Sequence, residues 1–139
     1  MTTAVYIPSE GLIAYDSRLT EGDSLLTDDF EKLSRFGDIR IIAAGTLGDD
    51  IKIAQAFIGE SDYTNDFAAL IIHEDDVYAF YRSEEKGLQS FKLTFPYAVG
   101  TGEKYAQAGI KMGLNAVQCV ELASKCDVNT GGRVRTLSV

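Results

Sequence analysis

The order in which apolar strand and helix patterns follow one another is the strongest constraint on the fold of this chain. Two β-rich runs, 3–7 and 12–15, flank the turn sequence Pro-Ser-Glu-Gly and predict an antiparallel hairpin. The run 39–44, apolar except for Arg40, predicts a strand that is covered on both faces. Further strands are expected at 30–36, 67–72, 77–81, 89–95, 97–99 and 133–139. The polar stretch 18–29 is expected to be a loop.

Helical spacing of apolar residues appears three times. The first helix is expected from about 49 to 58, and the second covers 103–112, with Tyr105, Ala108, Gly109 and Met112 on one face. The third begins at Asn115, where Gln118 can complete a capping box. The elements thus follow one another in the order strands, helix, strands, two helices and a final strand. This order predicts an α+β fold, a four-layer αββα sandwich of two antiparallel sheets flanked by helices. The 139 residues read as one domain, 1–139.

Composition narrows the function classes. A formal net charge of −8 argues against a nucleic-acid partner. No apolar run is long enough to cross a bilayer, and no signal peptide is evident, so a cytoplasmic protein without a membrane partner is expected. Cys119 and Cys126 lie two helical turns apart and are expected to be free, buried thiols. His73 has no second ligand nearby in sequence, so neither a metal nor a cofactor is expected.

A candidate catalytic group begins at the second residue. Removal of Met1 would leave Thr2 with a hydroxyl nucleophile and a free α-amine. That amine can act as the base, because its ordinary pKa of about 7.7–8.0 leaves a usable neutral fraction near pH 7. A lysine ammonium at Lys32 would lower the amine pKa, and Asp16 would hold that lysine in its charged form. The N–H of Gly45 would bind the oxyanion formed on attack.

Each of these residues also has a simpler interpretation when it is taken singly. Asp16 can end a strand with an Asx turn, Lys32 can be a solvated lysine among carboxylates, and Gly45 can form a bend before a helix. The functional interpretation therefore depends on their combination.

Together these motifs resemble the proteasome β-subunits and the HslV-type bacterial peptidases, over nearly the whole chain. Members of that family begin Thr-Thr, continue to Asp-Ser-Arg, and carry a lysine sixteen residues after the aspartate; here 32 minus 16 is sixteen. Residues 44–46 are similar to the family's Ala-Gly-Gly, and 100–102 to its Gly-Ser-Gly before a Tyr-Ala-rich helix. Residues 127–132, Asp-Val-Asn-Thr-Gly-Gly, resemble its closing Asp-x-x-Ser-Gly-Gly.

The resemblance implies an N-terminal nucleophile hydrolase fold and a set of roles. Thr2 would be nucleophile and base, Asp16 and Lys32 the activating pair, and Gly45 the oxyanion donor. Three further residues would support the α-amine and a catalytic water, namely Thr101, Asp127 and Thr130. Four residues beside the proposed site are the candidates for substrate binding, namely Thr20, Glu21, Thr46 and Gly48.

The chain also departs from the family pattern. The first hairpin is shorter, two usual serines are threonines, and residues 58–66 stand where the family has a second long helix. Those outer helices help hold stacked rings together. A homo-oligomer, with a single ring as one form, is therefore expected, and the shortened segment argues against an ATPase partner that docks on a ring.

Three functions remain open from the sequence. The first is a threonine-type peptidase acting on peptides or unfolded protein. The second is a non-catalytic assembly or binding subunit that retains Met1. The third is an amidohydrolase that acts on small molecules with the same scaffold.

Overall fold

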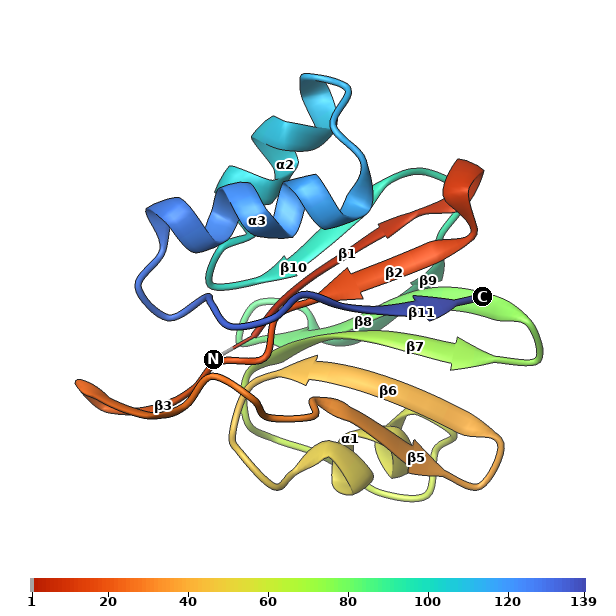
Figure 1. Ribbon diagram of the computed structural model, residues 1–139. Coiled ribbons are helices and arrows are strands. Elements are labelled where there is room, and N and C mark those ends of the chain that lie inside the picture. Colours follow the sequence, from red (N-terminus) through yellow and green to blue (C-terminus); the bar gives the residue numbers. More distant parts are fainter. Residues whose placement is uncertain (1) are drawn as a thin grey trace.

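Four layers make up the computed structural model, which describes residues 2–139 (Figure 1). The first sheet has the order β10-β1-β2-β11 and consists of β10 (Tyr97–Gly100), β1 (Thr3–Ile7), β2 (Leu12–Tyr15) and β11 (Arg135–Ser138). The second runs in chain order through β5 (Leu33–Phe36), β6 (Ile39–Ala44), β7 (Phe67–His73), β8 (Asp76–Ser83) and β9 (Gly87–Lys92). Neighbouring strands in both sheets are antiparallel.

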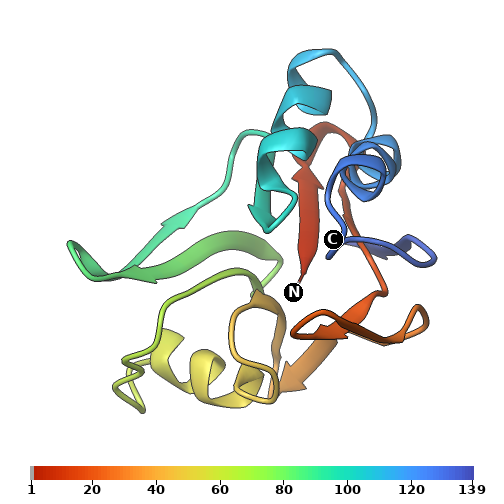
Figure 2. The ribbon, with the colours of Figure 1, turned by 90° about the vertical axis from the view of Figure 1, so that its left-hand side faces the viewer.

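Helices cover the outer faces of both sheets. In Figures 1 and 2, α2 (Glu103–Lys111) and α3 (Ala116–Cys126) lie over the first sheet, and α1 (Asp50–Phe57) lies at the opposite end of the molecule, against the second. The predicted αββα sandwich is therefore confirmed. None of the helices among residues 2–139 is long and apolar enough to span a membrane.

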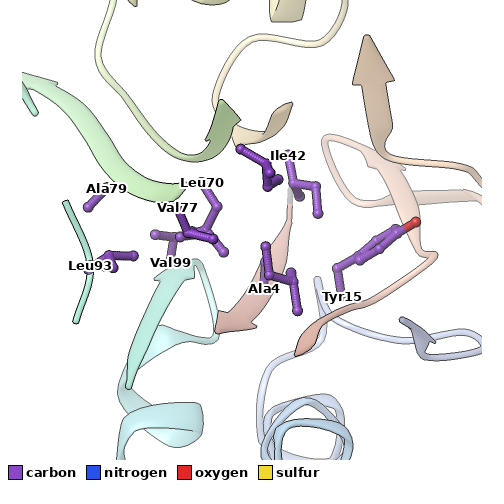
Figure 3. Packing of buried hydrophobic residues seen from close by; sticks show 10 residues of the cluster. Ala4, Tyr15, Ile42, Leu70, Val77, Ala79, Leu93 and Val99 are labelled. Carbon is purple, nitrogen blue, oxygen red and sulfur yellow. The ribbon is translucent and has the colours of Figure 1, made fainter. Parts of the chain in front are cut away.

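The buried side chains form three layers of core, one at each interface. The cluster between the two sheets includes Ile42, Leu70 and Val99 and is shown in Figure 3. A second cluster, around Ile53 and Phe80, packs α1 on the second sheet. The third lies under α2 and α3 and is built largely from alanines, Cys119 and Val120, which let those helices approach their sheet closely.

Strand β1 determines where the start of the chain lies. It pairs with both β10 and β2, so it is an inner strand of its sheet. The connection from β1 to β2 is the short 3₁₀ helix η1 (Pro8–Glu10), followed by Gly11 at φ 57°. Because this hairpin is tight, Thr3 at the beginning of β1 and Asp16 just after β2 meet at the same end of these two strands.

Two segments can be compared with the sequence prediction directly. Residues 18–29 are not a loop throughout, because β3 (Leu19–Glu21) and β4 (Ser24–Thr27) form a separate antiparallel hairpin. Its leucines, Leu25 and Leu26, are exposed, so the segment lacks the buried alternation that identifies a strand in a sequence. As expected, residues 58–66 contain no helix.

The helix boundaries were predicted well, but one buried face was not. The capping box of Asn115 and Gln118 is present at the start of α3. In α2, the buried residues are Ala106 and Gly109, whereas Tyr105 and Met112 are exposed. Ala108 is exposed as well, so of the four residues expected on one face only Gly109 is buried. Both cysteines are free, as expected, but Cys126 is exposed rather than buried.

Removing a large side chain between the sheets is expected to cost much more stability than removing an exposed one. Leu70→Ala should lower the free energy of unfolding by about 2–5 kcal/mol, because it leaves a cavity in the inter-sheet core. Leu25→Ala on the exposed hairpin should change it by no more than about 0.5 kcal/mol. Urea unfolding of both variants checks this, and equal losses would contradict the assigned core.

Candidate active site

A buried carboxylate, Asp16, lies where the beginning of β1 meets the end of β2. Its Oδ1 accepts hydrogen bonds from Lys32 Nζ at 2.7 Å and from the backbone N–H of Thr3 at 3.1 Å. Its Oδ2 accepts one from the N–H of Gly131, also at 3.1 Å. The side chain is fully buried, so these donors replace the water that an ionised carboxylate requires.

Lys32 is the cationic partner of this carboxylate. Its side chain is 4 % exposed. Burial lowers the pKa of the Lys32 ammonium, and the ion pair and hydrogen bond with Asp16 offset part of that effect. The sequence-based pairing of these two residues is thus present as a direct contact. A lysine held in this way can place a positive charge beside the start of the chain.

Hydroxyl groups connect the first strand to the loop after α3. Thr130 Oγ1 donates to Asp127 Oδ2 at 2.6 Å, and Thr101 Oγ1 donates to the same oxygen at 2.6 Å. Because the Thr130 proton is used in this way, Thr3 Oγ1 is the donor in its 2.7 Å contact with Thr130 Oγ1. Thr3 also accepts a bond from the N–H of Gly102.

The network brings together three predicted residues, Thr101, Asp127 and Thr130, and adds one that was missed. Thr3 is fully buried at the head of an otherwise apolar strand, and its hydroxyl is satisfied by this network. A polar residue at an inward position of such a strand is the signal that could have identified it.

Opposing effects act on the acidity of Asp127. Burial raises the pKa of its carboxyl, but hydrogen bonds from Thr101, Thr130 and the Asn129 N–H outweigh burial, so the pKa lies below its ordinary value of 3.8. The carboxylate therefore stays ionised near neutral pH and acts as an acceptor that orients both threonine hydroxyls.

Glycine is required at the point where β10 meets the start of the chain. Gly100 has a φ of 106°, and a Cβ there would lie 1.6 Å from the carbonyl oxygen of Thr2. That carbonyl accepts a hydrogen bond from the N–H of Thr101 at 3.1 Å. The close approach of the two backbones therefore fixes the position of Thr2.

A pocket of about 160 Å³ opens beside this position. Five of the predicted residues line it, namely Thr2, Thr20, Lys32, Gly45 and Thr46. Five residues that the sequence did not indicate complete the lining, namely Leu19, Phe30, Ala43, Leu47 and Asp50. Two predicted substrate-binding residues, Glu21 and Gly48, are exposed neighbours of the pocket and do not belong to its lining.

The loop carrying Gly45 is held from the segment 58–66, which contains no helix. Gly45 directly follows β6, and the loop runs from there to Asp49 before α1. The buried Tyr63 donates its hydroxyl proton to Asp49 Oδ2 at 2.5 Å. The segment 58–66 thus fixes the far end of this loop without a helix.

Chemically, the site combines a hydroxyl, a buried cation and an exposed backbone glycine around one small cavity. Among residues 2–139 no group of three or more His, Cys, Asp or Glu side chains is placed to hold a metal ion. His73 lies apart from the cavity, next to Asp38 and Glu74. The removal of Met1 concerns a residue outside the described part of the chain.

Solved structures of two kinds of protein have the same fold. The structure of Thiobacillus denitrificans BPH in complex with epoxomicin aligns with a TM-score of 0.71 and 16 % identity over 99 % of this chain and 97 % of that chain. A second structure of Thiobacillus denitrificans BPH aligns with a TM-score of 0.71 and 17 % identity over 98 % of this chain and 95 % of that chain. Eukaryotic HslV from Trypanosoma brucei aligns with a TM-score of 0.69 and 15 % identity over 99 % of this chain and 99 % of that chain.

The similarity is thus full-length in structure and low in sequence. No protein-family model matches the chain, and no curated protein sequence matches it either. At such identities the alignments establish the fold, and the resemblance to proteasome β-subunits and HslV-type peptidases is confirmed at that level.

A methyl group at position 100 is expected to disrupt the start of β1. Gly100→Ala should lower the free energy of unfolding by at least about 2 kcal/mol, because backbone strain and a steric clash add together. Gly37→Ala is the matched control, since Gly37 has a φ of 60° but a methyl group there would meet nothing within 4 Å. It should cost only about 1 kcal/mol. Equal losses in urea unfolding would contradict the close approach.

Removing one hydroxyl from the network should raise the pKa of Asp127. In Thr101→Val the carboxylate loses a hydrogen bond that favours its charged form, so its ¹³C NMR titration should shift toward higher pH. In the unmodified protein, the folded-state pKa lies below the unfolded one. The ionised Asp127 therefore stabilises the folded protein at pH values above its pKa in the unfolded chain. This stabilisation is lost as the pH falls through the pKa of Asp127 in the folded protein. An unchanged titration in the variant would show that Thr101 does not tune Asp127.

Proposed function

We propose that the chain is a threonine-type peptidase that cleaves amide bonds with Thr2 after removal of Met1. The observation that carries this proposal is the pocket lined jointly by Thr2, Lys32 and Gly45, with Lys32 Nζ 2.7 Å from a buried carboxylate oxygen. A nucleophile, a cation that tunes its base and a backbone donor are the parts that acyl transfer needs. The shared fold with BPH and HslV supports the same interpretation.

In this mechanism the α-amine of Thr2 accepts the proton of its own hydroxyl, and Oγ1 attacks the carbonyl carbon of the substrate. The N–H of Gly45 donates to the resulting oxyanion. Collapse of this intermediate breaks the C–N bond, the leaving amine takes the proton, and an ester to Thr2 remains. Water then attacks the ester with the α-amine again acting as the base, which releases the acid and restores the hydroxyl.

The surrounding residues prepare the α-amine for this role. The Lys32 ammonium lies beside the start of the chain and favours the neutral form of the amine, while Asp16 holds the lysine in place. Thr101, Asp127 and Thr130 would orient the amine and the attacking water by the hydrogen bonds that they share. Thr20 and Thr46 would contact the bound peptide in the pocket, with Glu21 and Gly48 at its margin.

The proposal also includes one domain over residues 1–139, a cytoplasmic location and a homo-oligomer. Support for self-association comes from the exposed aromatic pair of Phe91 and Phe95, whose rings stack at an angle of 16° beside the edge strand β9. No ATPase partner is included, because residues 58–66 form no helix that could hold stacked rings together.

Substitution of the nucleophile should separate catalysis from folding. Thr2→Ala should lower the rate of peptide hydrolysis by about 10³-fold or more, whereas Thr2→Ser, which keeps a hydroxyl, should retain measurable turnover. Lys32→Ala should be similarly inactive, and its folding must be checked separately because it leaves Asp16 buried without its cation. Fluorogenic peptides and circular dichroism provide the two measurements.

Covalent labelling distinguishes the peptidase from a non-catalytic subunit. Thr2 should be modified by a peptide boronate and by epoxomicin, the compound in the BPH complex, and mass spectrometry should map the adduct to Thr2. Thr2→Ala should not react. A folded, trimmed protein that never reacts and never hydrolyses peptides would instead be an assembly or binding subunit.

The small cavity supports one second candidate, an amidohydrolase for compact substrates. A volume of about 160 Å³ accommodates one side chain and could equally hold most of a small amide. This candidate predicts Thr2-dependent turnover of capped amino-acid amides but not of longer peptides or unfolded protein. Hydrolysis of the longer peptides would exclude it.

A further inference from the structure

One carboxylate in the pocket is not used by the proposed mechanism. Asp50 lines the cavity together with Thr2, although it belongs to the first turn of α1 and is far from Thr2 in sequence. Ser34 Oγ donates to its Oδ2 at 2.8 Å, so the carboxylate is positioned from the neighbouring strand β5. A residue that lines the cavity thus carries a carboxylate held in place by a neighbouring strand.

The remaining lining is both apolar and polar. Leu19, Phe30, Ala43 and Leu47 supply the apolar side chains. A side chain that combines a hydrocarbon stem with a polar end would therefore match both parts of the lining. Purely apolar side chains would leave the carboxylate without a partner in the filled pocket.

The charge balance of the cavity is negative. Among the described residues that line it, the ionisable groups are Lys32 and Asp50. Lys32 is paired at 2.7 Å with Asp16, so one ammonium stands against two carboxylates, those of Asp16 and Asp50. Asp49, the adjacent residue, adds to the negative potential, and its Oδ1 lies 3.9 Å from the exposed Lys52.

The environment of Asp50 favours a cationic ligand. Burial raises the pKa of the Asp50 carboxyl, the hydrogen bond from Ser34 opposes this, and the neighbouring Asp49 raises it further. The Asp50 carboxylate is thus incompletely solvated in its charged form. The position of Asp50 at the N-terminus of α1 nevertheless favours ionisation. A cation that enters the pocket would supply the missing stabilisation.

We infer that this pocket selects substrates with an arginine or lysine side chain at the residue whose carbonyl Thr2 attacks, with Asp50 binding the cationic end. The aliphatic stem packs against Leu19, Phe30 and Leu47. A preference measured as kcat/KM rests on the proposed peptidase activity. A preference measured as peptide binding does not require that activity.

The kinetic test compares fluorogenic peptides that differ only at that residue, which is arginine, citrulline or leucine. Citrulline has nearly the shape of arginine without its charge. The arginine peptide should have a kcat/KM at least about tenfold above that of the citrulline peptide. Asp50→Asn should reduce kcat/KM for the arginine peptide about 10–100-fold, so that the preference for arginine over citrulline and leucine is lost. Glu60→Gln is the control, because it removes one exposed carboxylate charge shortly after α1, at a residue that does not line the pocket.

A binding test separates failure of this inference from failure of the proposed function. Fluorescently labelled arginine and citrulline peptide amides are titrated with Thr2→Ala and with the Thr2→Ala/Asp50→Asn double variant, and anisotropy reports the dissociation constants. Tighter binding of arginine that disappears with Asp50→Asn supports the inference even if no peptide is hydrolysed. Equal binding of the two peptides, or a preference for arginine that survives Asp50→Asn, overturns it.

Discussion

The buried contact between Asp16 and Lys32 is the interaction on which the rest of this site depends. The carboxylate joins three parts of the chain that are remote in sequence, because it also accepts the N–H groups of Thr3 and Gly131. An ionised group with no access to water requires such donors, and removing one charged partner of a buried pair is strongly destabilising. The start of β1, the irregular segment before β5 and the loop after α3 are therefore fixed relative to one another.

The rest of the fold maintains that arrangement with few residues. The short β1–β2 hairpin brings Thr3 and Asp16 to the same end of these two strands. Gly100 allows β10 to approach the Thr2 carbonyl. On the other side of the pocket, Tyr63 anchors Asp49 from a segment without helical structure. The buried Tyr63 hydroxyl thus contributes to holding the end of the Gly45 loop.

Much of the architecture follows from local patterns that the sequence displays. The apolar run of β6 and the capping box of α3 have strong physical signatures, and the Asp16–Lys32 spacing indicated a pair that is in direct contact. The β3–β4 hairpin has no such signature, because Leu25 and Leu26 remain exposed. The buried face of α2 was predicted only in part, because Gly109 is buried but Tyr105 and Ala108 are exposed.

The pocket lining was the least predictable feature. Thr20, Thr46 and Gly45 were found because they stand beside recognisable motifs, but Asp50 enters the cavity through the geometry of the β6–α1 connection. A carboxylate at the start of a helix ordinarily indicates only a favourable interaction with the helix dipole. Its position beside Thr2 depends on tertiary structure, and no sequence spacing reveals it.

The proposed mechanism requires Thr2 to provide both the hydroxyl and the α-amine of the catalytic group. N-terminal sequencing of the purified native protein, together with its intact mass, checks this requirement. We expect a chain that begins at Thr2 and is lighter by one methionine residue than the translated sequence. A protein that retains Met1 quantitatively, in cells with normal methionine trimming, would contradict the mechanism and would favour a non-catalytic subunit.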